Sequence, residues 1–215
     1  MKAIQKVLVG FLVSLAVLVV PQKAQAIVVF DNTENFFTSG SYLLMTQGAP
    51  FDFDNDQAAG FTVTGGSYAL NSIELPVTFS QGPNEFDLWL VNDNGGQPGS
   101  LLESFHFSNP PEGTYYTWLT ANSASNPVLN DGNLYWVVGS ATGPDAVIGW
   151  NVSRTNGYAA HTAEDGNGWH VGSDWNRGAF RVTGSEPGQA PVPEPATLSL
   201  FGAGLAGFLL RRRKK

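Results

Sequence analysis

The chain has 215 residues, with 18 acidic and 11 basic side chains, a formal net charge of −7 and no cysteine. The acidic balance excludes nucleic acid and anionic lipid surfaces as partners of the main part of the chain, because both are bound by basic patches. The lack of cysteine excludes disulfide support, so a folded domain here must be held together by its core.

Residues 1–26 have the three parts of a secretory signal peptide. Lys2 and Lys6 supply the positive start, residues 7–20 form an apolar run, and Ala24-Gln25-Ala26 is a small-x-small cleavage pattern. We expect a signal helix that is cleaved after Ala26. A permanent N-terminal anchor is the alternative, but the run is short and the cleavage pattern follows it.

Residues 27–185 form what we call the passenger domain. Between residues 27 and 190 the chain carries three arginines, no lysine and 17 acidic residues, which gives a formal charge of −14. This length is sufficient to bury a core as one domain, and we find no internal repeat.

The passenger domain is predicted to be all-β, because short apolar and β-branched runs alternate with clusters of Gly, Pro, Asn and Asp. Pro76 interrupts the run 70–79, which predicts an edge strand or a bulge there. Many short strands at this spacing predict a jelly-roll-like β-sandwich. The expected strands are 27–30, 58–63, 70–79, 86–90, 101–107, 115–120, 134–138, 146–152 and 179–182.

Two groups of polar residues are candidate metal sites. Asp52-Phe-Asp54-Asn-Asp56 places carboxylates at alternate positions, as at the start of a calcium-binding loop, but Gln57 stands where an EF-hand requires glycine. We therefore expect either an irregular Ca²⁺ site or a solvated acidic loop. His161 and His170 lie near Glu164, Asp165 and Asp174 and are a weaker candidate for a transition-metal site.

Six tryptophans make carbohydrate binding a candidate function. Trp169 and Trp175 lie among Asn, Asp and Arg residues in a segment that we interpret as a loop, and we expect them to form an exposed platform. Trp136 lies in the apolar run 134–138 and is expected in the core. The alternative for the tryptophans is that they fill the interior of the sandwich.

We expect no enzymatic activity, since the chain has no G-x-S-x-G motif, no cysteine and only three histidines. His106 lies between Phe105 and Phe107 and is expected to point away from the core. A glycosidase would need two carboxylates about 5–9.5 Å apart, and a sequence cannot place such a pair.

The C-terminal residues have an ordered layout. Residues 186–195 form a linker that ends in Pro193-Glu194-Pro195, and residues 196–210 carry no charge before the basic stop Arg211-Arg212-Arg213-Lys214-Lys215. As a helix the apolar run reaches about 22 Å, and long basic side chains can extend it toward the ~30 Å hydrocarbon core. We expect residues 196–215 to be a short transmembrane helix with a cytoplasmic basic tail.

This order of parts resembles the PEP-CTERM sorting signal, with Pro193, Glu194 and Pro195 as its motif. The resemblance implies export by the general secretory route, transient anchoring in the inner membrane and processing by an exosortase-type enzyme. The final location would be the cell surface or the extracellular matrix. A plain tail anchor is the alternative, although it would not need the Pro-Glu-Pro.

The passenger domain carries turn and core patterns at residues 58–63, 70–75, 86–90, 94–101, 149–150, 168–169 and 180–184. With these patterns it resembles the choice-of-anchor R domains, which are bacterial surface modules with no assigned activity. Together the two resemblances imply a structural or adhesive role in the extracellular polysaccharide of a biofilm. The alternatives are a carbohydrate- or calcium-binding module and, more remotely, a glycoside hydrolase.

Overall fold

Alternating apolar residues produce a fold in which every described regular element is a strand. The structure, a computed structural model, describes residues 26–38, 42–47, 54–113, 115–162 and 168–188. The strands are β1 (Ile27–Asp31), β2 (Tyr42–Gln47), β3 (Gln57–Thr62), β4 (Tyr68–Gln81), β5 (Glu85–Asp93), β6 (Pro98–Ser108), β7 (Thr117–Asn122), β8 (Val128–Leu129), β9 (Leu134–Ala141), β10 (Ala146–Asn151), β11 (Gly157–Thr162), β12 (Trp169–Trp175) and β13 (Arg181–Ser185).

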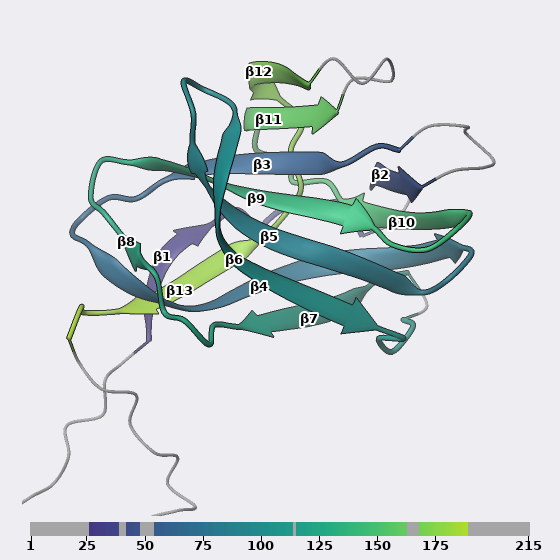
Figure 1. Cartoon of the computed structure of the whole chain (residues 1–215), viewed down its shortest axis with the longest axis horizontal. Coiled ribbons are helices and arrows are strands. Elements are labelled where there is room, and N and C mark those ends of the chain that lie inside the picture. The colour runs from purple at the N-terminus through teal and green to yellow at the C-terminus, as the bar shows by residue number, and fades with distance from the viewer. Residues whose placement is uncertain (1–25, 39–41, 48–53, 114, 163–167, 189–215) are drawn as a thin grey trace, which may run out of the picture. The chain divides into compact units, whose positions relative to one another are not determined.

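The strands pair into two antiparallel sheets (Figure 1). The seven-stranded sheet has the order β1-β13-β4-β10-β2, with β7 and β8 also paired to β4. The six-stranded sheet has the order β12-β11-β3-β9-β5-β6. The 14-residue strand β4 is the centre of the first sheet, since it pairs with β13, β10, β7 and β8.

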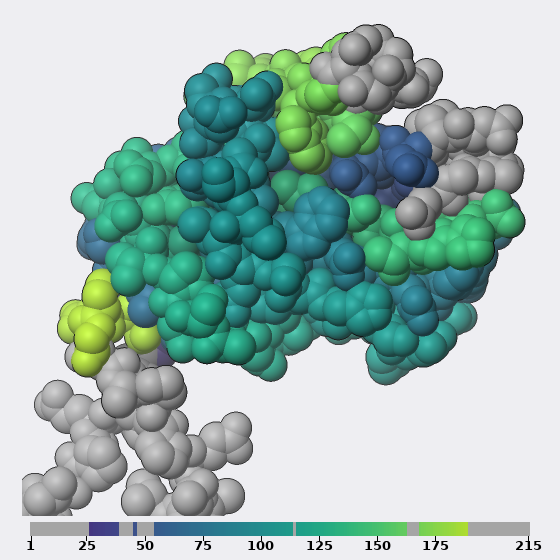
Figure 2. Space-filling model, viewed as in Figure 1, coloured from purple at the N-terminus to yellow at the C-terminus, as the bar shows by residue number. Residues whose placement is uncertain are grey.

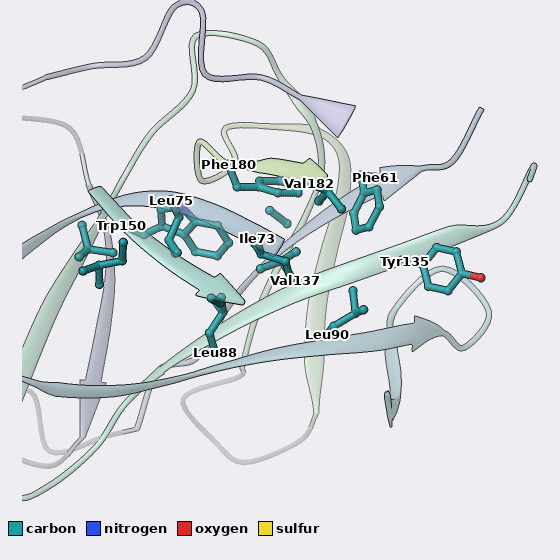
Figure 3. Packing of buried hydrophobic residues seen from close by; sticks show 14 of the residues in the cluster. Phe61, Ile73, Leu75, Leu88, Leu90, Tyr135, Val137, Trp150, Phe180 and Val182 are labelled. Carbon is teal, nitrogen blue, oxygen red and sulfur yellow. The ribbon is translucent and has the colours of Figure 1, made fainter. Parts of the chain in front are cut away.

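One hydrophobic core joins the inner faces of the two sheets. Leu75 and Val182 of the seven-stranded sheet belong to the same buried cluster as Phe61, Leu88 and Val137 of the six-stranded sheet. Figure 3 shows these side chains pointing into the space between the ribbons. The predicted all-β class with two packed sheets is confirmed.

Residues 26–188 form one compact unit that contains this core. Among the described residues no helix is long and apolar enough to cross a membrane. The predicted signal helix and the predicted span at 196–215 lie outside the described residues.

Pro76 lies inside β4, which is a central strand and not the predicted edge strand. The alternative prediction, a strand with a bulge, agrees with the register of β4, which shifts at Asn71 against β13 and at Ser80 against β10, although not at Pro76 itself. On one side of β4, the pairing with β13 ends at Glu74 and the pairing with β10 begins at Val77. Pro76 therefore lies where β4 changes partners, and among the described residues no strand pairs with it on that side. A proline, which lacks a backbone donor, is tolerated at such a point.

Candidate functional site

The outer surface of the six-stranded sheet carries a second apolar cluster, separate from the core. Trp136 and Val138 of this cluster alternate along β9 with the core residues Tyr135 and Val137. Because successive side chains of a strand point to opposite faces, the second cluster lies on the outer face. Its buried members are Ala58, Val91, Trp136, Val138 and Ala160, and the partly buried Trp89, Leu134 and Trp169 pack against them.

Cross-strand pairs arrange these residues in a row across the sheet. Trp89 lies opposite Val138, which lies opposite Ala58. Ala58 pairs in turn with Ala160 of β11. Trp169 lies on the next strand, β12. The smaller side chains of Val138, Ala58 and Ala160 therefore lie between Trp89 on one side and Trp169 on the other. Figure 2 views this side of the domain, with the β5–β6 hairpin in teal and the β11–β12 hairpin in light green.

Trp136 and Tyr158 make up a second row on the same face. The buried Trp136 donates its indole N–H to Asp93 Oδ1 at 2.8 Å. Tyr158 is 41% exposed, and its ring meets Trp136 edge-on at 6.2 Å. A Cβ at Gly60 would lie 2.7 Å from the Cβ of Tyr158, so the glycine lets the tyrosine lie across the sheet. We call Trp89, Trp136, Tyr158 and Trp169 the outer aromatic face.

A row of polar side chains borders the outer aromatic face. Asp87 lies between His106 of β6 and Ser140 of β9, and its Oδ1 is 2.7 Å from His106 Nδ1. Next in the row is Asp56, whose backbone N–H donates to the hydroxyl of Thr162. Burial raises the pKa of Asp56; a hydrogen bond from Ser140 opposes this shift, and the charge of Asp54 adds to it. Hydrogen-bond donors and acceptors therefore lie beside the exposed rings of the outer aromatic face.

Trp169 and Trp175 do not form one platform, and both belong to strand β12 rather than to a loop. The register of β12 against β11 shifts between the pairs Gly172–Ala159 and Trp175–Gly157. Between these pairs β12 has one residue more than β11, so side chains after this bulge point to the opposite face of the sheet from the one that the regular alternation would give. Trp169 therefore packs on the outer cluster, whereas Trp175, which is 43% exposed, stacks on His161 at 5.8 Å.

The other predicted site residues are only partly described. His106 is exposed, as expected. Rings of His161 and His170 lie 5.4 Å apart as a cross-strand pair, and Asp54 is exposed beside the half-buried Asp56. Within the described ranges no group of three or more His, Cys, Asp or Glu side chains could hold a metal ion. Asp52, Ala24, Pro193–Pro195 and Arg211–Lys215 lie outside the described residues.

The three arginines of the passenger domain are all engaged and form no basic patch. Arg181 pairs with Asp31 at 2.7 Å and with Glu74 at 3.3 Å. Arg177 is buried and donates to the backbone oxygen of Gly60, and the guanidinium of Arg154 lies 4.2 Å from the ring centre of Phe37.

Comparison with known proteins identifies the C-terminal segment. Residues 191–214 match the model of the PEP-CTERM protein-sorting motif. This confirms the predicted sorting motif, which marks an exported protein that is anchored in a membrane before an exosortase processes it. No curated protein and no solved structure matches the chain.

Sequence reasoning missed Trp89 and Tyr158 as members of a candidate site. A signal for this site was present in the uninterrupted apolar run 134–138. A strand that is apolar at every position is covered on both faces, whereas a strand with a solvated face alternates. The run therefore indicated apolar packing on the outer face as well as in the core.

Proposed function

We propose that the processed protein is a structural or adhesive component of an extracellular polysaccharide layer, to which it binds through the outer aromatic face. The PEP-CTERM motif supports export and sorting to the surface. The observation that carries the binding proposal is a half-exposed aromatic cluster on the solvent side of a β-sheet, bordered by a polar row. The resemblance of the passenger domain to choice-of-anchor R modules agrees with this role.

The chemistry of the outer aromatic face suits sugar rings. The C–H face of a pyranose packs against an aromatic ring, and its hydroxyl groups need nearby donors and acceptors. Trp89, Tyr158 and Trp169 supply rings with exposed surface. Asp87, His106 and Thr162 supply hydrogen-bonding groups along one border.

The charge of the passenger domain restricts the class of glycan. With three engaged arginines and no lysine between residues 27 and 190, the domain repels acidic polymers. The proposed ligand is therefore a neutral polysaccharide. β-Linked pyranoses with equatorial hydroxyls fit best, because their flat C–H faces can lie along a row of rings.

We propose binding without catalysis. A cavity of about 40 Å³ lies between β4, β10 and residues 110–113, and Glu112 is the sole carboxylate among the described residues that line it. This volume admits water but not a sugar ring. A hydrolase remains the alternative, since Asp56 directly precedes β3 and Asp87 lies on β5, the two strands that flank β9. Release of reducing ends from the polymer would favour it.

Affinity electrophoresis of residues 27–188 in gels that contain hydroxyethylcellulose, barley β-glucan, galactomannan or alginate tests the proposal. We expect retardation in at least one neutral gel and none in alginate. Trp169→Ala and Trp89→Ala should each weaken retention roughly ten-fold, as expected for aromatic anchors. Trp175→Ala is the matched control, because it removes an exposed tryptophan of the same strand from the other side of the sheet. Free migration in all four gels would refute the proposal.

A further inference from the structure

We propose that the passenger domain has a second glycan-binding site on the opposite outer face, so that one molecule cross-links two polysaccharide strands. This inference rests on the proposed function. The second site is a trio of aromatic rings, Phe36, Tyr116 and Trp118, on the outer side of the seven-stranded sheet.

The aromatic trio is a rigid cluster drawn from two parts of the chain. Phe36 meets Tyr116 edge-on at 5.2 Å and Trp118 edge-on at 5.6 Å, and the last two rings are 6.3 Å apart. Phe36 is held in place by a bridge to Ser153. Rings that brace one another keep Trp118 in one orientation although it is 43% exposed.

Strand alternation places the trio outside the core. Leu119 of β7 and Leu75 of β4 are core residues, so the neighbouring Trp118 and Pro76, which pair across the two strands, face outward. The outer aromatic face belongs to the other sheet. The two aromatic surfaces are thus separated by the full thickness of the sandwich, whose sheets pack about 10 Å apart.

Polar groups border the trio as they border the outer aromatic face. One row further along the sheet, Thr120 lies opposite Glu74, which lies opposite Arg181. Arg181 in turn pairs with Asp31 of β1. This row offers a hydroxyl, two carboxylates and a guanidinium, in fixed positions, to the hydroxyl groups of a sugar that lies on Trp118.

The exposed area of the trio fits a sugar better than a second copy of the chain. Trp118 is 43% exposed and the other two rings are half-buried. Aromatic side chains have about 150–250 Å² each, so the trio exposes on the order of 200 Å², whereas a stable protein interface buries ~800 Å² per partner. The charge of −14 between residues 27 and 190 further opposes self-association.

Agglutination of polysaccharide-coated beads distinguishes a domain with two glycan-binding sites from a domain with one, because a monomer with one site cannot link two beads. Beads coated with each of the three neutral polysaccharides are mixed with residues 27–188, and binding and agglutination are measured together. We expect the native domain to agglutinate the beads as a monomer. Trp118→Ala should still bind, within about two-fold, but its agglutination titre should fall at least ten-fold, because avidity requires two sites. Trp175→Ala, which removes an equally exposed tryptophan, should behave as the native domain.

Any of the following results would contradict the proposal of a second site. Binding without agglutination by the native domain, or full agglutination by Trp118→Ala, would leave the proposed function intact and remove the second site. A dimer that is lost in Trp118→Ala would assign the trio to self-association. Failure of the native domain to bind any of the three polymers would remove both proposals. Phe36→Leu, which takes away the bracing ring, repeats the test if Trp118→Ala does not fold.

Discussion

Glu103 ties the two sheets together at one end of the sandwich, and its removal is a quantitative test of the fold. Its carboxylate, on β6, accepts hydrogen bonds from the Ser123 hydroxyl at 2.5 Å, from the Ala124 amide at 2.7 Å and from the Ser125 amide at 3.0 Å. These donors lie in the loop that leaves β7 of the other sheet. Glu103 is only 9% exposed, so water replaces the carboxylate poorly.

The expected cost follows from these three contacts. Hydrogen bonds to a charged group contribute about 1.5–3 kcal/mol each, but three bonds to one carboxylate are not additive. Glu103→Ala should therefore lower the free energy of unfolding by about 3 kcal/mol. For a domain of this size one kcal/mol corresponds to about 2–4 °C, so the midpoint of thermal unfolding should fall by roughly 6–12 °C.

The pH dependence gives an independent readout. Burial alone would raise the pKa of Glu103, but the hydrogen bonds from Ser123, Ser125 and Ala124 outweigh it and hold the pKa below its ordinary value. A carboxyl with a lowered pKa in the folded state stabilises the fold fully above its unfolded pKa, about 4.3. This stabilisation is lost as the pH falls through the lower, folded value. Glu103→Gln should remove that part of the acid sensitivity.

Glu85→Gln is the control for both measurements. Glu85 accepts a hydrogen bond from the exposed Ser108 at 3.1 Å, and its loss should change stability by less than about 0.5 kcal/mol. Unfolding followed by circular dichroism from pH 3 to pH 7 compares the variants. If Glu103→Ala and Glu85→Gln unfolded within 2 °C of each other at pH 7, the role given to Glu103 would be refuted.

Three further outcomes are expected. Gly178→Ala should destabilise the domain by about 3 kcal/mol in thermal unfolding, the upper end of the usual cost of overpacking, because its Cβ would overlap the indole ring of Trp150 in a fully buried site. If residues 52–56 hold calcium, 5 mM Ca²⁺ should raise the unfolding midpoint of the native domain but not of Asp54→Asn; equal midpoints with and without the ion would dismiss the site. Replacing Pro193-Glu194-Pro195 by alanines should leave the chain anchored in the membrane but block processing, visible as a larger band, and a normally processed product would contradict the role of the motif.

Much of the sandwich could be predicted, because strands that are buried on one or both faces have alternating or continuous apolar residues in the sequence. Strands β4, β5, β9 and β10 follow alternating or continuous apolar runs, and each was predicted from its run. Strands β2, β8, β11 and β12 were missed. The reason can be seen in the residues of β11 and β12. Their small and polar residues carry little apolar pattern, and they are held as strands by their backbone pairing with β3 and with each other.

The candidate site was less predictable because it depends on registers. Trp169 and Trp175 are close in sequence, but a one-residue shift in β12 turns them to opposite sides. Trp118 and Phe36 are far apart in sequence and meet only because segment 36–37 lies beside residues 152–153. A sequence shows which residues are aromatic, but pairing and bulges decide which of them share a face.

The mass of the native protein, isolated from cells, tests most directly the claim that both ends are processed and the domain between them is exported. We predict a mature chain that begins at Ile27 and ends close to Pro193–Pro195, recovered outside the inner membrane. A chain of the full 23.0 kDa, recovered from the cytosol with both ends intact, would contradict the account.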